Sequence, residues 1–404
     1  MTSRQPATRN NLYLPAVAIV LALGIALRIY PSSSYKGVGF DEGFYQHYVS
    51  MLNAVGLIGY PKISASYLAY QRGLTFSVLP PMRFLYIFTS HLWSVTTHAD
   101  PMTSLHDMSC LFTILTLPVS YLFARRLGGK WIALGVLALV CCAPTQIHMS
   151  QHAMVDGVFS FWALLCLWLL WENLQRPNHP GWLFAWGFAL VCMVMTKENA
   201  FFAYVAMGAI VIANRWLRFG TVNARLLATM FLGPLLGVLA LVALAGGFQQ
   251  IIAIYQQSVS KNYTLPYAIA TGDGPWHRYL SDILLISPVV LLLALGELFQ
   301  LRRDNKGGWF LVLFITSSYL IMCNIKYGMN LRYTIMWDMP LRYLAVCQLY
   351  KLGSYFGARK NHVVLALVVA LCLVELREYY IFFVQHDLYE LSAMDMLHAT
   401  NILK

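Results

Sequence analysis

Charged residues are scarce in this sequence. Asp, Glu, Lys and Arg make up 11% of the 404 residues, whereas an ordinary soluble domain carries roughly 25%. Hydrophobic residues account for 59% of the chain, and the mean hydropathy is +0.59. This composition excludes an ordinary soluble globular protein. It predicts an all-α polytopic membrane protein, because helices satisfy their own backbone groups in lipid.

The sequence also lacks cysteine patterns typical of disulfides or zinc sites, and it lacks a basic face typical of nucleic-acid binding. The eight cysteines lie in or at the edges of apolar segments, without a Cys-x-x-Cys motif or a Cys/His ligand spacing. This argues against a disulfide framework and a zinc site. The formal charge of +11 comes from short Lys/Arg clusters between apolar segments and forms no single basic face. We expect no nucleic-acid partner and no cofactor; a divalent metal is an open alternative that no motif indicates.

Long apolar segments are what the chain does contain. A bilayer core of about 30 Å needs roughly 20 helical residues. About eleven segments qualify: 12–30, 106–124, 131–147, 157–173, 182–196, 199–214, 226–245, 282–300, 309–325, 333–350 and 362–381. The first has no small-residue cleavage pattern and is followed by many more spans, so we interpret it as a retained helix. We expect one membrane-embedded domain over residues 1–404 without a separate soluble domain.

Basic residues mark alternate connections between these segments. The clusters are Arg4 with Arg9, Arg125 with Arg126 and Lys130, Arg176, Arg215 with Arg218 and Arg225, Arg302 with Arg303 and Lys306, and Lys351 with Arg359 and Lys360. The positive-inside rule makes these connections and the N-terminus cytoplasmic. The long connections 31–105 and 246–281 then lie outside. We expect the function to face outward from a bacterial inner membrane.

One stretch of the first long connection predicts a short interfacial helix. The sequence PPMRFLYIFTSHLW, Pro80–Trp93, has two prolines at a helix start and about a dozen apolar-rich residues, too few to span a bilayer. If it spanned, every later segment would invert and the basic clusters would face the wrong side. We therefore expect juxtamembrane helices in this connection.

A carboxylate pair follows the first span in GVGFDEGFYQHYV, Gly37 to Val49. The glycine spacing does not match a dinucleotide-binding fingerprint, and no strand precedes it. Asp41 has two interpretations: it caps a helix that begins near Phe44, or it accepts a proton from a nucleophile at the membrane surface. Glu42 is then a catalytic, orienting or structural neighbour. The two interpretations of Asp41 are compatible.

Two further polar groups interrupt apolar sequence. In IHMSQHAMVDG, a continuous helix would place His148, His152 and Asp156 on one face, as metal ligands or as polar groups lining an outward cavity. A break near Pro144 is expected. In TKENAFF, Lys197 and Glu198 are either a mutually satisfied ion pair or part of a functional site, since charges at such depth mark functional pathways.

Several cations lie on the side that the positive-inside rule leaves poor in basic residues. Together they would form a positive pocket for an anion such as phosphate, although each alone is ordinary as a solvated loop charge. The candidate binding residues are Arg72, Arg83, His152, Lys197, Glu198, His277, Arg278, Lys326, Arg332 and Tyr333.

The order of these motifs resembles the C-type (GT-C) integral-membrane glycosyltransferases that take sugars from polyprenyl phosphates, especially protein O-mannosyltransferases and lipid A aminoarabinose transferases. The matching pieces are DEGFYQHYVSML, PPMRFLYIFTSHLW, LPVSYLFARRLGGKWIAL, MVDGVFSFWALL, MTKENAFF and LRYTIMW. The resemblance covers about the first 215 residues well and the rest loosely.

The resemblance implies a site and its substrates. An acid in the first outer loop matches Asp41, the acid opening the fourth span matches Asp156, and the Lys after the fifth matches Lys197. The donor would be a polyprenyl-phosphate sugar; the acceptor would be a lipid, a glycan or a protein. Many relatives have Lys before the double proline, where this chain has Leu79, so Arg72 or Arg83 would supply that phosphate contact. Relatives often carry a large outer C-terminal domain, which we do not expect here.

Two other classes of function compete with a transferase. A transporter or flippase for polyprenyl-linked glycolipids or small molecules would need access alternating to both sides. Against it, no pair of Gly/Pro-broken spans lies in two matching halves. A non-catalytic scaffold would leave the outer charges scattered. We expect an inverting glycosyltransferase with Asp41 as the acceptor-side acid/base and Asp156 as a second catalytic carboxylate.

Overall fold

The structure is a computed structural model that describes residues 12–30, 38–326 and 328–403. Within these residues the secondary structure is helical and contains no β-strand, which confirms the all-α prediction. Arg4, Arg9 and Gly37, on which part of the sequence interpretation rests, lie outside the described residues.

Four of the described helices are long and apolar enough to cross a membrane: α5 (Pro101–Gly128), α8 (Val155–Gln175), α10 (Ala200–Leu217) and α11 (Ala224–Ala245). A fifth candidate is the pair α6 (Lys130–Cys141) and α7 (Pro144–Ser150), bent by 56°. These helices indicate an integral membrane protein. Shorter apolar helices are α1 (Tyr13–Ile29), α9 (Pro180–Thr196), α15 (Pro288–Phe299) and α16 (Lys306–Met322).

The last two predicted segments contain α17 (Asp338–Ser354) and α18 (Lys360–Tyr379), joined by η4 (Gly357–Arg359). Helices therefore occur in all eleven predicted segments, but length and composition support four or five spans. The count of eleven stays a prediction.

Three predicted spans are not continuous α-helices. The segment 282–300 is divided into α14 (Arg278–Ile286) and α15 because Pro288 has no N–H to continue the α14 hydrogen-bond ladder. The segment 333–350 begins as a 3₁₀ helix, η3 (Leu331–Trp337), which leads into α17. The third is 131–147, and its predicted break at Pro144 is confirmed, since α6 ends at Cys141 and this proline begins α7. The helix α7 packs against η3.

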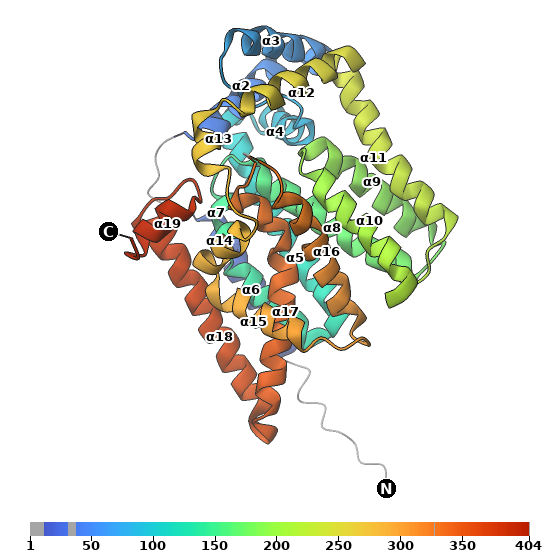
Figure 1. Ribbon diagram of the computed structural model, residues 1–404, viewed down its shortest axis with the longest axis vertical. Helices are drawn as coiled ribbons and strands as arrows, with labels where there is room; N and C mark the ends of the chain where they lie inside the picture. Colours follow the sequence, from blue (N-terminus) through green and yellow to red (C-terminus); the bar gives the residue numbers. More distant parts are fainter. Residues whose placement is uncertain (1–11, 31–37, 327, 404) are drawn as a thin grey trace.

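Helices from the two long connections form a layer over one end of the bundle, at the top of Figure 1. The first connection contributes α2 (Phe40–Val55), η2 (Leu57–Gly59), α3 (Tyr60–Gly73) and α4 (Phe84–Thr97). The second contributes α12 (Phe248–Asn262), which packs on α3, and α13 (Pro266–Thr271). The expected short helix is α4. It begins at Phe84 instead of the prolines and continues past Trp93 to Thr97.

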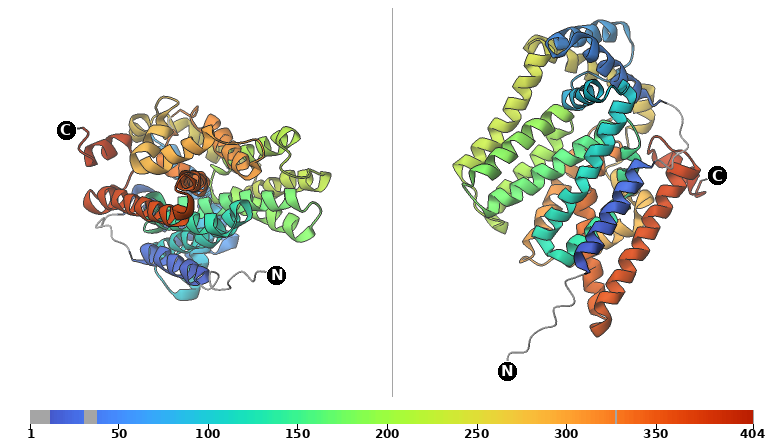
Figure 2. Two further views of the ribbon diagram at one scale, coloured as in Figure 1. Left: turned by 90° about the horizontal axis from the view of Figure 1, so that it is seen from below. Right: turned by 180° about the vertical axis from the view of Figure 1, so that it is seen from behind.

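The bundle has two sides below this layer. Seen from behind, α9, α10 and α11 form one side, and α1 and α18 lie on the other (Figure 2). The helix α18 ends in a short π-helix, η5 (Tyr380–Gln385), followed by α19 (Ala393–Ala399). The η4 connection between α17 and α18 lies at the end of the molecule opposite the layer (Figure 1). One continuous apolar core joins the helices.

Candidate active site

A cavity of about 750 Å³ lies where the layer meets the bundle. Its wall combines α2, the segment before α4, α12 and α13, the approach to η3, and the chain after η5. Polar side chains in the wall are Asp41, Ser77, Arg83, Ser258, Asn262, Tyr267, Thr271, Asn330, Arg332, Tyr333, Tyr389 and Glu390. Five short stretches that are far apart in the sequence therefore line one space.

Asp41 faces this cavity and pairs with Arg332. Its Oδ2 lies 3.2 Å from Nη2 of Arg332, and Oε1 of Glu390 lies 3.7 Å from the same nitrogen. Burial alone would lower the pKa of Arg332, but the Glu390 and Asp41 carboxylates raise it well above its usual value. One guanidinium thus holds two carboxylates at the cavity wall.

Glu42 points away from the cavity and is buried. The helix α2 begins at Phe40, so the expected cap by Asp41 of a helix from Phe44 is wrong. Glu42 makes the capping contact instead, accepting from the amide of Gly39 at 2.8 Å. It also accepts from the amide of Ala153 at 2.9 Å and lies 3.2 Å from Nδ1 of His152. These contacts fix Glu42 at the start of α2, and its neighbour Asp41 therefore lies at the cavity wall.

The titration of Glu42 agrees with this role. Burial would raise its pKa, but the hydrogen bonds from His152 and from the Gly39 and Ala153 amides lower the pKa below its usual value. The carboxylate is therefore ionised when it holds the start of α2.

A second ion pair lies beneath the aromatic ring of Tyr333. Lys197, in the connection between α9 and α10, pairs with Asp156 in the first turn of α8, and both side chains are buried. The ammonium lies 4.3 Å from the centroid of the Tyr333 ring, a cation–π distance. Burial lowers the pKa of Lys197 to about 8, against the effect of Asp156. Tyr333 itself lines the cavity.

A third ion pair joins Arg83 and Glu198. The Nε of Arg83 lies 3.1 Å from Oε2 of Glu198, and Nη1 donates to the hydroxyl of Tyr45 at 2.5 Å. Lys197 and Glu198 are therefore not paired with each other, as one interpretation of TKENAFF held. Each pairs with a partner on another element, and the cations Arg83, Lys197 and Arg332 gather at one place.

The predicted histidine and aspartate face is divided among three elements. His148 lies in α7, His152 in the loop after it, and Asp156 in α8, because α7 ends at Ser150. His148 Nε2 lies 3.0 Å from the carbonyl of Tyr389, and its ring stacks on Phe383. In the described ranges, no group of three His, Cys, Asp or Glu side chains converges in a way that suits a metal.

Of the ten candidate binding residues, three line the cavity: Arg83, Arg332 and Tyr333. His152, Lys197 and Glu198 do not line it but make the contacts described above. The remaining four do not line it either. Arg72, His277 and Lys326 are exposed, and Arg278 pairs with Asp282 at 3.6 Å. Of the two residues expected to compensate for Leu79, only Arg83 lines the cavity. Leu79 lines it too, and its carbonyl accepts from Tyr48.

Sequence reasoning missed the contribution of the chain after α18. Tyr389 and Glu390 line the cavity, and Nδ2 of Asn330 donates to Glu390 at 3.3 Å. A side chain at position 39 would overlap the Tyr389 ring, so Gly39 permits this close approach. The only signal in the sequence was that Gly39 precedes the acidic pair.

The solved structures similar to this chain show a shared fold. ArnT from Cupriavidus metallidurans in the apo state has a TM-score of 0.53 at 13% identity, covering 98% of this chain and 76% of that one. ArnT bound to undecaprenyl phosphate has a TM-score of 0.51 at 15% identity, covering 97% and 75%.

The archaeal oligosaccharyltransferase AglB from Archaeoglobus fulgidus, in complex with an inhibitory peptide and a dolichol-phosphate, has a TM-score of 0.61 at 13% identity. The match covers 95% of this chain and 57% of that one, so the chain spans little more than half of its length.

Sequence comparison gives the family. No curated protein sequence matches the chain significantly. Residues 18–249, more than half of the chain, match the family described as dolichyl-phosphate-mannose-protein mannosyltransferase. This confirms the resemblance found in the order of the motifs. The chain therefore belongs to the dolichyl-phosphate-mannose-protein mannosyltransferase family and has the fold of the C-type glycosyltransferases.

Proposed function

We propose that this glycosyltransferase moves a sugar from a polyprenyl-phosphate donor to an acceptor hydroxyl. The observation that carries the proposal is that Arg83 and Arg332 line one cavity with the carboxylate of Asp41, while the Lys197 ammonium lies against the Tyr333 ring of the same wall. Guanidinium groups suit a phosphate because they donate paired hydrogen bonds. ArnT has been seen with undecaprenyl phosphate and AglB with a dolichol-phosphate, which supports a donor of this class.

The cations would act on the leaving group. In the reaction, an acceptor oxygen attacks C1 of the sugar and the bond between C1 and the phosphate oxygen breaks. The electron pair leaves with the polyprenyl phosphate, whose developing charge Arg332, Lys197 and Arg83 would stabilise. Because the nucleophile enters opposite the leaving group in a single displacement, the anomeric centre is inverted.

Asp41 would act on the acceptor. It takes the proton of the attacking hydroxyl, which is the role of a general base within hydrogen-bond reach. In the structure its carboxylate holds Arg332. A donor phosphate that takes over this guanidinium leaves Asp41 available to the acceptor. Asp156 would keep the Lys197 ammonium in place, and Glu42 and His152 would hold the start of α2.

The membrane arrangement belongs to the same proposal. Eleven spans over a single domain, with a cytoplasmic N-terminus, would put the cavity on the outer face, in the inner membrane of a bacterium. The α17–α18 connection, with Lys351, Arg359 and Lys360, lies at the end of the molecule opposite the layer (Figure 1), which supports this orientation. The acceptor would be a lipid, a glycan or a protein that reaches the outer surface.

The test uses purified protein and a panel of synthetic polyprenyl-phosphate sugars, with mass spectrometry for loss of sugar. Asp41→Asn should lower turnover by roughly 10²- to 10⁴-fold, the contribution typical of a general base. Glu390→Gln is the matched control, because it also removes a carboxylate from Arg332 but no proposed base. Near-wild-type turnover of folded Asp41→Asn would overturn the base role. Transport of the intact donor without sugar loss would favour a flippase.

No cofactor is part of this proposal, because Arg83, Lys197 and Arg332 would supply positive charge to the phosphate. Turnover should therefore persist after treatment with EDTA and dialysis. Loss of turnover that Mg²⁺ or Mn²⁺ restores would contradict this expectation.

A further inference from the structure

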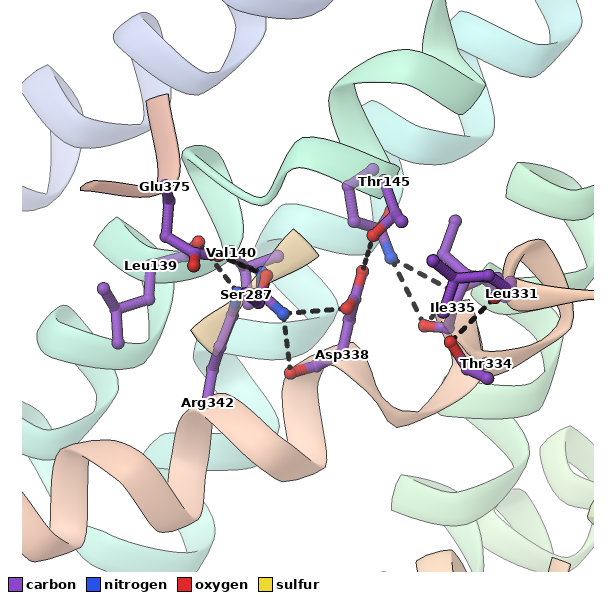
Figure 3. Close-up of polar contacts among 12 residues, drawn as sticks. Leu139, Val140, Thr145, Ser287, Leu331, Thr334, Ile335, Asp338, Arg342 and Glu375 are labelled. Carbon is purple, nitrogen blue, oxygen red and sulfur yellow. Dashed lines mark hydrogen bonds and ion pairs between the residues drawn. The ribbon is translucent and has the colours of Figure 1, made fainter. Parts of the chain in front are cut away.

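A second group of buried polar side chains lies outside the cavity wall. We call it the Arg342 cluster: Arg342 and Asp338 in α17, Glu375 in α18, Ser287 before α15, and Thr145 in α7 (Figure 3). None of these residues lines the cavity. The proposed reaction gives this cluster no role, yet burying charges is expensive unless they are well paired.

Arg342 is satisfied on all sides. Nη1 donates to Oδ1 of Asp338 at 2.8 Å, Nη2 to Oε2 of Glu375 at 2.5 Å, and Nε to the carbonyl of Leu139 at 3.1 Å. These partners belong to three different helices, α17, α18 and α6. The guanidinium therefore fixes the start of α17 against the end of α6.

The end of α6 is the break in the bent span. Helix ends leave carbonyl groups without intrahelical partners. Arg342 takes the carbonyl of Leu139, and Arg28 from α1 donates to those of Val140 and Cys141 at 3.1 and 3.3 Å. Two arginines from different helices thus donate hydrogen bonds to the last carbonyl groups of α6, which stabilises the break.

Asp338 connects the broken span to η3. One carboxylate oxygen accepts from Arg342, and the other accepts from the hydroxyl of Thr145 at 3.1 Å (Figure 3). Asp338 is the first residue of α17, directly after η3, and Thr145 is the second residue of α7. In addition, Ser160 Oγ in α8 donates to the carbonyl of Ile335 in η3 at 3.3 Å.

The two connected segments carry the proposed phosphate site. The η3 segment bears Arg332 and Tyr333, and the Tyr333 ring lies against the Lys197 ammonium. The chain after α7 leads through Met154, whose sulfur lies 3.7 Å from Nη1 of Arg332, to Asp156. A shift of α7 against η3 would therefore change the distance between Arg332 and the Lys197–Asp156 pair.

We infer that the hydrogen bond between Thr145 and Asp338 positions Arg332 and Lys197 for the phosphate of the donor. Thr145 and Asp338 act through α7 and η3 and would make no contact with the substrate themselves. The inference rests on the proposed function, because it assumes that these cations bind phosphate. Its structural basis is independent: the buried Asp338 carboxylate, directly after η3, accepts from Thr145 of α7 with one oxygen and from Arg342 of its own helix with the other.

The test compares two substitutions that differ in one group. Thr145→Val keeps the shape but removes the hydroxyl, and Thr145→Ser keeps the hydroxyl. Thr145→Val should raise the donor KM by about tenfold, the factor expected for one hydrogen bond to a charged group, with a smaller change in kcat. Thr145→Ser should stay near wild type. Simple destabilisation lowers the amount of active protein but leaves KM unchanged.

Thr116→Val is the control, since the hydroxyl of buried Thr116 donates to the Phe112 carbonyl of its own helix at 2.9 Å. Binding of farnesyl phosphate, a short polyprenyl phosphate, is measured on the same variants by native mass spectrometry. Wild-type affinity and KM in Thr145→Val would overturn the inference. Equal losses in Thr145→Val and Thr116→Val would also overturn it. If Thr145→Val does not fold, Thr145→Ala is measured against Thr145→Ser.

Arg332→Gln separates this inference from the proposed function. If Arg332→Gln binds farnesyl phosphate as well as wild type does, the proposed phosphate site fails, and the positioning role fails with it. If Arg332→Gln loses binding while Thr145→Val keeps it, only the positioning role is wrong. If both Arg332→Gln and Thr145→Val lose farnesyl phosphate binding and Thr145→Ser keeps it, the result supports both the phosphate site and the positioning role.

Discussion

Asp41 in α2 and Arg332 in η3 form an ion pair of 3.2 Å at the wall of the cavity. A phosphate that binds this guanidinium competes with the carboxylate for the same donor groups. Binding of the proposed donor is then an exchange of partners on Arg332, which would couple occupation of the proposed phosphate site to release of the proposed base, Asp41. The first two predictions follow from this exchange.

Removal of the guanidinium should weaken donor binding strongly. Arg332→Gln should raise the donor KM by at least about thirtyfold, because truncating one partner of a buried charge pair costs about 2 kcal/mol or more. Arg332→Lys should fall in between, since an ammonium lacks the planar pair of donors. Lys62→Gln, an exposed cation of α3, is the control. A similar rise in KM for Lys62→Gln would point to a general charge effect.

Removal of the second carboxylate should have the opposite effect. Glu390 lies 3.7 Å from the Arg332 guanidinium, so Glu390→Gln removes a competitor for the phosphate. Affinity for farnesyl phosphate should rise by up to roughly fivefold, in line with the ~1 kcal/mol upper value for a partly exposed pair. Titration by native mass spectrometry measures it. A weaker complex would mean that Glu390 helps to hold the ligand.

Removing one charge of the buried Lys197–Asp156 pair should destabilise the protein more than removing both. Asp156→Asn leaves a buried ammonium without its partner and should destabilise the protein by about 3–5 kcal/mol at pH 7. The double variant Asp156→Asn/Lys197→Met removes both charges and should recover much of the loss. Thermal unfolding in detergent compares the two. A double variant no more stable than Asp156→Asn would speak against an uncompensated charge as the cause.

Donor affinity should fall as the pH rises through about 8. Lys197, whose pKa is lowered to about 8 by burial, is charged below that pH and neutral above it. The proposed donor is a phosphodiester, so its own charge stays constant there. The stability of the fold should change in the opposite direction to donor affinity. Between pH 8 and the usual lysine pKa, the unfolded chain binds more protons than the folded chain, so the free energy of unfolding rises with pH. Lys197→Arg, which stays charged, should flatten the affinity profile.

Much of the arrangement was readable from the sequence because membrane helices leave long apolar runs. The sequence also marked Asp41, Lys197 and Arg332 as unusual, since charges are rare in such a chain. It was wrong about the helix start near Phe44, because Glu42 and not Asp41 makes the capping contact. That choice depends on Ala153 and His152, which are distant in sequence.

Long-range pairing was the part that the sequence could not supply. Lys197 and Glu198 are neighbours in the chain, yet their partners come from α8 and from the segment before α4. Tyr389 and Glu390 follow the last predicted span and looked like ordinary tail residues. Conversely, His277 and Lys326 resembled site residues by type and predicted side, but both are exposed away from the cavity wall.

The contact between Gly39 and Tyr389 has a consequence for biosynthesis. Because the cavity wall joins the start of α2 to the chain that follows α18, it cannot close until every intervening span has been inserted. An insertion intermediate that stops after α16 would expose Asp41 and Arg83 without Arg332. Such a chain would have an incomplete cavity wall and would lack the Arg332 guanidinium of the proposed phosphate site.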